Sequence, residues 1–462
     1  MSWNEVSLGT WQRQLDELEI ILKRVADPYK PIGREHWALN IRALLRFDNS
    51  VSQQRILAGL RRAWVRTRYH HPFIAARLRG DDHIYEVPSD ETKLETWLRE
   101  SVVIEESKSI AEYWLTAPSM EYSCLLYFPR SSEILLRVHH WTIDGMGGVH
   151  FLDRFLTYLS TDRPAPSFGT EHLRLPPPYI EAAGLPATSS VPAKAAACDA
   201  FTSFVSEMPS TGLPALPVPT PGGTKVFRLS SPPTTLSSLL AATRNHNLGF
   251  AAAVQSAIIQ ATRQRAPEPL AKRPFSTTTF LDHRKYLKPP YIDTGAWPMS
   301  VYMMALPTTQ PEADFMTTAK NMQTVLKQDL TVGKSFVTEW YPEFCSLYAE
   351  LMTRPLPEGM VPPTQPQLIS IGSMDEIVKT RYGNRKEKGE REGNALVVEV
   401  KEVEPVLDNM KEQVVVFQWS FGGRWWLNAC YNERFCEEVV VQGFLRRVRE
   451  ILFAELGVEE TE

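Results

Sequence analysis

A proline-rich stretch divides this chain into two parts that each carry alternating helix and strand patterns. Twelve of the 35 prolines lie between Pro164 and Pro221, together with many Ser, Thr, Ala and Gly residues. A stretch this long without periodic apolar residues is typical of a connection between domains or of a partly mobile loop. The 462 residues also exceed what one hydrophobic core usually supports. We therefore predict domains at 1–165 and 224–462, joined by a crossover linker at 166–223.

Apolar periodicity predicts the elements inside each part. Residues recurring at helical spacing predict helices, and runs of β-branched and aromatic residues bounded by turn signals predict strands. Because both types alternate throughout, the expected fold is a mixed α/β architecture. The charged, glycine-rich segment 380–394 is expected to be an exposed loop. Helices are expected at 12–24, 54–68, 148–160, 235–246, 250–263 and 433–456, and strands at 123–128, 133–140, 225–230, 275–281, 299–306, 367–372, 395–403, 412–420 and 424–431.

Composition excludes several classes of function. The formal net charge is −4 and the sequence pI is about 6.3, which argues against a surface built for nucleic-acid phosphates. The first residues lack the pattern of a signal peptide, and no apolar run approaches the ~18 residues that span a bilayer. The cysteines are odd in number and form no CxxC pair, so a reducing, cytosolic compartment is expected. They are Cys124, Cys198, Cys345, Cys430 and Cys436.

The string His139-His140-Trp141-Thr142-Ile143-Asp144-Gly145 is the most informative motif in the chain. It follows a predicted strand, and strand alternation puts the two imidazoles on opposite faces, so that one can point into a cleft. A histidine suits work as a base because its unperturbed pKa of about 6.5 leaves it largely neutral near pH 7. Gly145 allows a tight bend and close approach by a substrate. His140, Asp144 and His150 could be interpreted as metal ligands, but no cysteine joins them and the local pattern is strand then turn, so no metal is expected.

This string resembles the HHxxxDG motif of the condensation-domain and plant-type acyltransferase superfamily. All four fixed positions match, and the segments RRAWVRTRYHHPFIAARL (61–78), FLDHRKYLKPPY (280–291), LISIGSMD (368–375) and FQWSFGGRWWLNACYNERF (417–435) are similar to further segments of that family. The plant-type DFGWG signature is absent, and WSFGG (419–423) stands in its place. The chain is therefore most similar to the fungal trichothecene 15-O-acetyltransferase group.

The resemblance implies two chloramphenicol-acetyltransferase-like domains, each a mixed sheet flanked by helices, with a channel between them. It implies that His140 is the catalytic base at the middle of that channel. Asp144 is expected to pair with Arg284 and, with Gly145, to hold the geometry of the site. Candidates for the channel wall and for the donor that stabilises the oxyanion are Trp419, Ser370, Ser373, Ser420 and His139, with Trp419 ranked first. The basic pair Lys272 and Arg273 could meet coenzyme A phosphates, although solvated surface charges explain this pair equally well.

Three functions follow as alternatives. The leading one is an acyl-CoA-dependent O-acyltransferase, with acetyl-CoA as the expected co-substrate and a small-molecule alcohol as acceptor, without a tightly bound cofactor. The second is a free-standing condensation enzyme that takes its acyl group from an acyl carrier protein. The third is a family member that only binds a small molecule. The family expectation is a monomer, and the identity of the acceptor and the acyl length are left open.

Overall fold

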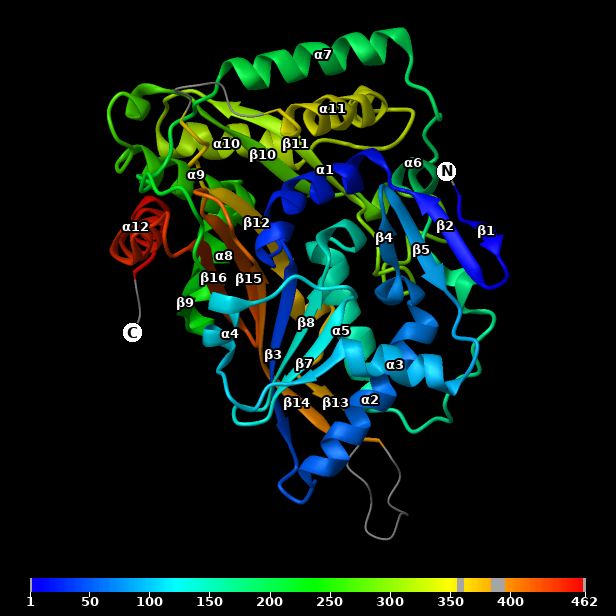
Figure 1. Cartoon of the computed structure of the whole chain (residues 1–462). Helices are drawn as coiled ribbons and strands as arrows, with labels where there is room; N and C mark the ends of the chain where they lie inside the picture. Colours follow the sequence, from blue (N-terminus) through cyan, green and yellow to red (C-terminus); the bar gives the residue numbers. More distant parts are fainter. Residues whose placement is uncertain (1, 355–360, 384–394, 460–462) are drawn as a thin grey trace.

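A computed structural model of the protein describes residues 2–354, 361–383 and 395–459. Within these ranges helices cover several separate sheets, so the mixed α/β fold predicted from the sequence is confirmed (Figure 1). The predicted loop at 380–394 lies mostly outside the described residues. None of the described helices is long and apolar enough to cross a membrane.

A six-stranded sheet carries the HHxxxDG motif, and it is built from both parts of the chain. Its strand order is β13-β14-β3-β8-β7-β6, so two strands from beyond residue 380 extend a sheet of N-terminal strands. Leu407 pairs with Leu39 and Val398 with Phe47 along the β14–β3 ladder. This one sheet therefore contains strands from both of the domains predicted from the sequence. The predicted domain boundaries themselves stay predictions. The strands are β3 (Leu39–Phe47), β6 (Val102–Ile104), β7 (Cys124–Phe128), β8 (Glu133–Val138), β13 (Arg381–Tyr382) and β14 (Val398–Leu407).

Three smaller sheets complete the framework in the described part of the chain. One contains strands before residue 87 in the order β1-β2-β5-β4, one is the hairpin β10-β11, and one has the order β12-β15-β16-β9. In the last sheet, β12 runs parallel to β15. The strands are β1 (Asn4–Ser7), β2 (Thr10–Gln14), β4 (Arg77–Arg79), β5 (Asp82–Glu86), β9 (Thr224–Ser231), β10 (Phe275–Asp282), β11 (Met303–Gln310), β12 (Gln367–Ser373), β15 (Val415–Phe421) and β16 (Arg424–Asn432).

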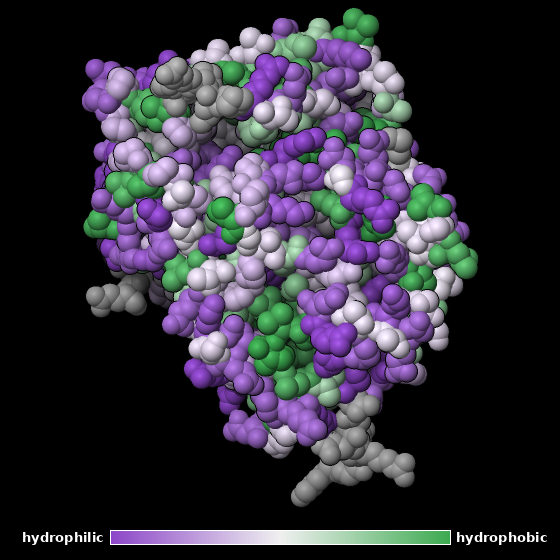
Figure 2. Space-filling view, viewed as in Figure 1, coloured by the Kyte–Doolittle hydropathy of each residue, from purple (hydrophilic) through white to green (hydrophobic). Residues whose placement is uncertain are grey.

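Helices cover these sheets and divide the interior into apolar clusters. The largest cluster lies between the six-stranded sheet and α2 and α5, and it includes Trp64, Phe151 and Trp419. Figure 2 shows a mostly hydrophilic face whose most extended apolar patch lies low in the view, in the area where Figure 1 shows β7 and β3. The α-helices are α1 (Glu17–Ala26), α2 (Gln53–His70), α3 (Glu91–Ser101), α4 (Ile110–Thr116), α5 (Gly145–Leu159), α6 (Tyr179–Ala183), α7 (Val191–Ser206), α8 (Pro233–Asn245), α9 (Phe250–Arg263), α10 (Phe315–Leu326), α11 (Phe336–Met352) and α12 (Glu438–Leu456).

Several local expectations differ from the structure, and two of the differences lie away from the HHxxxDG motif. The helix expected at 12–24 begins only at Glu17, because Asp16 caps it through the backbone N–H groups of Leu18 and Glu19 and the preceding residues pair as β2. The linker expected at 166–223 contains α7, which lies across the top of the molecule above α11 (Figure 1). Pro192 lies in the first turn of α7. Proline is favoured in the first turn of a helix, so this residue is a local sequence signal for the start of α7.

Candidate active site

The HHxxxDG string begins where β8 ends, and the chain then turns before α5. The strand stops at Val138, and His140–Thr142 forms a single 3-10 turn. Strand alternation therefore does not set the direction of His140, contrary to the expectation of a strand through residue 140. The turn is closed by a bond from Thr142 N to His139 O (3.0 Å), and this turn presents the two imidazoles to different surroundings.

His140 is held by its own turn. Its Nδ1 lies 2.9 Å from the carbonyl oxygen of Ile143, and because a carbonyl can only accept, Nδ1 must carry the proton. Nε2 then holds the lone pair; it makes no hydrogen bond to the described residues, and it is not among the fully buried nitrogens. Burial is the main cause of a lowered pKa of His140. The ring is therefore neutral near pH 7, in the tautomer that a base requires.

The segment Glu35-His36-Trp37 lies against both motif histidines. Glu35 accepts a bond from Nδ1 of His139 (2.9 Å), and the ring of Trp37 stands edge-on to His140 at 6.4 Å between centroids. Trp37 has φ +63, a left-handed backbone that is rare for a bulky residue and that persists only where the surrounding structure enforces it. These three residues are not predicted from the sequence, because one charged and two aromatic residues before a strand leave no periodic signal.

The ion pair expected between Asp144 and Arg284 is present. Nη1 of Arg284 lies 2.7 Å from Oδ2 of Asp144, and both side chains are 2% exposed. Asp144 also caps α5 by accepting from Gly147 N (2.9 Å) and accepts from Tyr302 N (2.8 Å). The Asp144 carboxylate thus joins the motif to the segments that follow β10 and precede β11. Its hydrogen bonds go to these structural partners and not to His140.

Two glycines of the motif region allow close packing. A Cβ on Gly145 would lie 3.1 Å from Cδ1 of Ile371 on β12. Gly145 itself begins α5 with a helical backbone, so the tight bend expected there is not what requires a glycine. Gly147, which is not predicted from the sequence as a site residue, is packed more tightly: a Cβ there would lie 2.3 Å from Pro298 O and 2.9 Å from Nη2 of Arg284.

Apart from His139, the candidates for the channel wall and the oxyanion donor lie on two neighbouring strands, β12 and β15, but not on one face. Trp419 is buried in the same apolar cluster as Ile371, and its indole Nε1–H has no partner among the described residues. Ser370 instead accepts a bond from Gln418, the neighbour of Trp419 on β15, and so faces the other side of the sheet. Ser373 is the register partner of Ser420, one position beyond Trp419 along β15. The structure therefore separates Trp419 from the three serines.

The basic pair Lys272 and Arg273 is not brought to the motif. The pair precedes β10, whereas Asp282 ends that strand and Arg284 follows it. At the usual rise per residue the strand is about 23 Å long, so the basic pair and the ion pair of Arg284 lie at opposite ends of it. Lys272 is exposed, and Arg273 donates through Nε to Pro209 O (3.1 Å).

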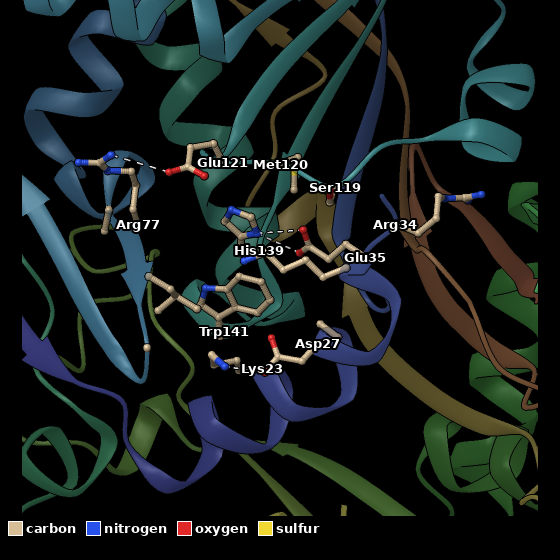
Figure 3. A pocket seen from close by; sticks show the side chains of 15 residues that line it. Lys23, Asp27, Arg34, Glu35, Arg77, Ser119, Met120, Glu121, His139 and Trp141 are labelled. Atoms are coloured by element: carbon tan, nitrogen blue, oxygen red, sulfur yellow. Dashed lines mark hydrogen bonds and ion pairs between the residues drawn. The ribbon is translucent and has the colours of Figure 1, made fainter. Parts of the chain in front are cut away.

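A cavity lies beside the motif on the side of His139. It has a volume of about 270 Å³, and Glu35, His139 and Trp141 form part of its wall (Figure 3). His140 is 7% exposed and does not line this cavity. The solvent channel expected past His140 stays a prediction.

Known proteins share the sequence pattern and fold of this chain. Residues 221–346 match the family described as phthiocerol/phthiodiolone dimycocerosyl transferase C-terminus. The chain is 26% identical over its whole length to 99% of acetyltransferase pigO and, over 99% of its length, 24% identical to 88% of O-acetyltransferase pigM, both from Monascus ruber. The solved TRI3 trichothecene 15-O-acetyltransferase from Fusarium sporotrichioides superposes with a TM-score of 0.79 at 16% identity, with 98% of this chain and 97% of that one covered. The first condensation domain of the calcium-dependent antibiotic synthetase gives 0.64 at 13%, with 98% and 97% covered.

These matches and the motif define the class of protein. The fold is that of the two-lobed condensation-domain and acyltransferase proteins. The chain belongs to the condensation-domain and plant-type acyltransferase superfamily, and it is an acyltransferase enzyme.

Proposed function

We propose that this enzyme transfers an acetyl or other acyl group from acyl-CoA to a hydroxyl of a secondary metabolite, with His140 as general base. The observation that carries the proposal is the bond between Nδ1 of His140 and the carbonyl of Ile143 (2.9 Å). It leaves Nε2 with its lone pair free, and a free, oriented imidazole nitrogen is what base catalysis requires.

The transfer takes place in one displacement through a tetrahedral intermediate. Nε2 of His140 takes the proton of the acceptor hydroxyl as its oxygen attacks the thioester carbonyl, and the carbonyl oxygen becomes an oxyanion. When the intermediate collapses, the C–S bond breaks and the coenzyme A thiolate takes the proton from His140. Our candidate donor to the oxyanion is the indole N–H of Trp419, which is buried and has no hydrogen-bond partner among the described residues. The motif supplies no Ser or Cys nucleophile, which supports transfer without an acyl-enzyme.

The relatives support an acceptor from fungal secondary metabolism. Two are named acetyltransferases of Monascus ruber, and a third relative, 23% identical, is named an azaphilone biosynthesis cluster protein of Aspergillus terreus. We expect a monomer in the cytosol that needs no tightly bound cofactor. The exposed Lys272 is a candidate contact for the coenzyme A phosphates.

A second candidate function is transfer from an acyl carrier protein to form an ester or amide, and the similarity in fold to a condensation domain favours it. The chemistry at His140 would be the same. A family member that only binds its ligand is the third possibility, and the free Nε2 of His140 argues against it.

An acyl-transfer assay distinguishes these functions. The protein is incubated with acetyl-CoA and a panel of hydroxylated polyketides and terpenoids, and acceptor-dependent release of free coenzyme A is measured. We expect turnover that falls by about 10²–10⁴-fold in His140→Ala and is unchanged in His246→Ala, a matched loss of an exposed histidine. Activity only with an acetylated carrier protein would favour the second function, and no turnover with either donor would favour the third.

A further inference from the structure

Trp37 is held in a strained backbone by a segment from the C-terminal part of the chain. Its φ of +63 lies in the left-handed region, which glycine adopts freely and asparagine tolerates better than bulky residues do. Trp37 N donates to Asp408 O (2.7 Å), and Asp408 N donates to Ala38 O (3.1 Å). The β3–β14 ladder then begins with Leu39 opposite Leu407. The pairing of β3 with β14 therefore enforces a backbone whose cost the tryptophan side chain must offset through its own contacts.

The indole of Trp37 lies where two apolar clusters meet. It packs against the cluster of the six-stranded sheet and against a second cluster that contains Leu22 of α1 and Tyr302 before β11. In the described part of the chain, it is the one partly buried apolar side chain that packs against both. Its Nε1–H makes no hydrogen bond to the described residues and is not among the fully buried nitrogens. The indole thus extends from the interior to a point that solvent reaches.

A buried histidine supports this indole. The ring of His36 stacks on that of Trp37, with 4.9 Å between the centroids and 28° between the planes, and His36 is 2% exposed. Met410 N donates to Nδ1 of His36 (3.0 Å). Since a backbone N–H can only donate, this Nδ1 is unprotonated and the ring is neutral, and burial holds the pKa of His36 well below its usual range. The indole therefore rests on a ring that is fixed and uncharged.

The same indole contacts the imidazole of His140. The two centroids are 6.4 Å apart with 60° between the planes, an edge-to-face geometry that is attractive between aromatic rings. Among the described residues, Trp37 supplies the only aromatic contact of His140. The bond between Nδ1 and Ile143 O (2.9 Å) fixes one edge of the imidazole, but the terminal torsion of histidine is broad, so one hydrogen bond leaves the ring able to tilt. The contact with Trp37 is a second constraint on the direction of Nε2.

We propose that Trp37 is a positioning residue that holds the imidazole of His140 so that the lone pair of Nε2 points at the acceptor hydroxyl. The left-handed backbone places the indole, His36 supports it, and the indole restrains the imidazole. Base catalysis requires the nitrogen to lie within hydrogen-bond reach of the proton that it takes. The inference rests on the proposed function for the role of His140, whereas the restraint on the ring is measured without catalysis.

Four variants separate the ring contact from folding. Trp37→Gly is the main one, because glycine adopts φ +63 without strain and the bonds to Asp408 can stay. Trp37→Asn also tolerates this backbone and lacks the ring, whereas Trp37→Phe keeps an aromatic ring beside His140. Trp340→Ala is the matched control, which removes another partly buried tryptophan, one that packs on Phe344 within α11. Circular dichroism and denaturant unfolding check that each protein is folded.

NMR of the full chain, carrying nitrogen-isotope-labelled histidine and no substrate, tests the restraint. The signals of His140 are assigned by their loss in His140→Ala, and the unchanged protein should show a slowly exchanging Nδ1–H. In Trp37→Gly and Trp37→Asn this proton should exchange about 2- to 12-fold faster, the fold-change that corresponds to one aromatic pair. The pKa of His140 should also rise towards its ordinary value, because burial lowers it and the indole contributes to that burial. Trp37→Phe and Trp340→Ala should leave the exchange rate and the pKa close to those of the unchanged protein.

The acyl-transfer assay connects the restraint to the reaction. Trp37→Gly should lower kcat by about 10- to 100-fold, the cost of a misplaced reacting group, and leave the KM for acetyl-CoA unchanged, because the position of the ring matters in the chemical step. Trp37→Phe should recover most of kcat, and Trp340→Ala should keep it.

Three results would overturn the proposal. They are unchanged exchange and pKa of His140 in both Trp37→Gly and Trp37→Asn, altered spectra with full kcat, and a raised KM for acetyl-CoA with kcat unchanged. Absence of turnover in the unchanged protein would overturn the proposed function instead, and the spectra would then decide by themselves whether Trp37 holds the ring.

Discussion

The carboxylate of Asp144 accepts a hydrogen bond from Arg284 at 2.7 Å, and with it the cap of α5 is tied to the end of β10. Asp144 lies in the motif, and Arg284 lies 140 residues further along the chain. Arg284 Nη2 also donates to Ser300 O (3.0 Å). The position of the HHxxxDG turn therefore depends on an ion pair that itself takes no part in the proposed proton transfer.

Loss of this pair should damage folding before it damages chemistry. Breaking a buried ion pair by removing one partner typically costs about 3–5 kcal/mol, so we expect Asp144→Ala to lower the free energy of unfolding by that amount in denaturant titrations. Asp282→Asn, which alters the half-exposed second partner of Arg284, should cost about 1 kcal/mol or less. A purified Asp144→Ala protein that is fully stable yet inactive would assign Asp144 to the chemistry instead.

The pH dependence of turnover should follow a lowered pKa of His140. Burial disfavours the charged ring, so the neutral base persists below its ordinary pKa of about 6.5. We expect kcat/KM to be level from about pH 6.5 to 8 and to fall only at lower pH, where His140 becomes protonated. The profile is measured between about pH 4.5 and 8.5, with folding checked at each pH. An acid limb centred above pH 7 would contradict this assignment.

Gly147 should tolerate no side chain. A Cβ there would lie 2.3 Å from the carbonyl oxygen of Pro298, and a backbone atom cannot move aside as a flexible side chain can. We expect Gly147→Ala to cost about 1–3 kcal/mol, the usual cost of overpacking. Gly443→Ala is the matched control: it lies inside α12 with its nearest contact at 3.7 Å, so it should raise stability by about 0.5–1 kcal/mol. Thermal and denaturant unfolding of the two variants measure the difference.

His71 should make the fold sensitive to mild acid. It is buried, it bonds to the hydroxyl of Tyr158 (3.2 Å), and burial lowers its pKa to about 3. Because the folded pKa lies below the unfolded value of about 6.5, the unfolded chain binds a proton that the folded chain does not, and stability falls as pH drops from 6.5 towards 3. One proton contributes up to about 1.4 kcal/mol per pH unit.

The measurement for His71 is the free energy of unfolding between pH 7 and 5, where most carboxylates stay ionised. We expect the slope to be smaller in His71→Gln than in the unchanged protein. A His246→Gln control, at an exposed position, should leave the slope as it is. Equal slopes in all three proteins would show that His71 gains its proton equally in both states.

The sequence by itself determined the fold class and the centre of the candidate site. Apolar periodicity is local, so it predicted α2, α9, β7 and β10 close to their observed bounds. The fixed spacing of the HHxxxDG string predicted His140 as the base, and the similarity of the 280–291 segment to the family led to the pair of Asp144 with Arg284, which the structure contains.

Only the tertiary structure decided the contacts between distant segments. The bond of Glu35 to His139 joins residues 104 positions apart, and β14 pairs with β3 across more than 350 residues. Trp37 has its left-handed backbone where its N–H bonds to Asp408 O (2.7 Å). Pattern and propensity describe how a residue behaves beside its chain neighbours, whereas these contacts depend on the path of the whole chain, which no local window contains.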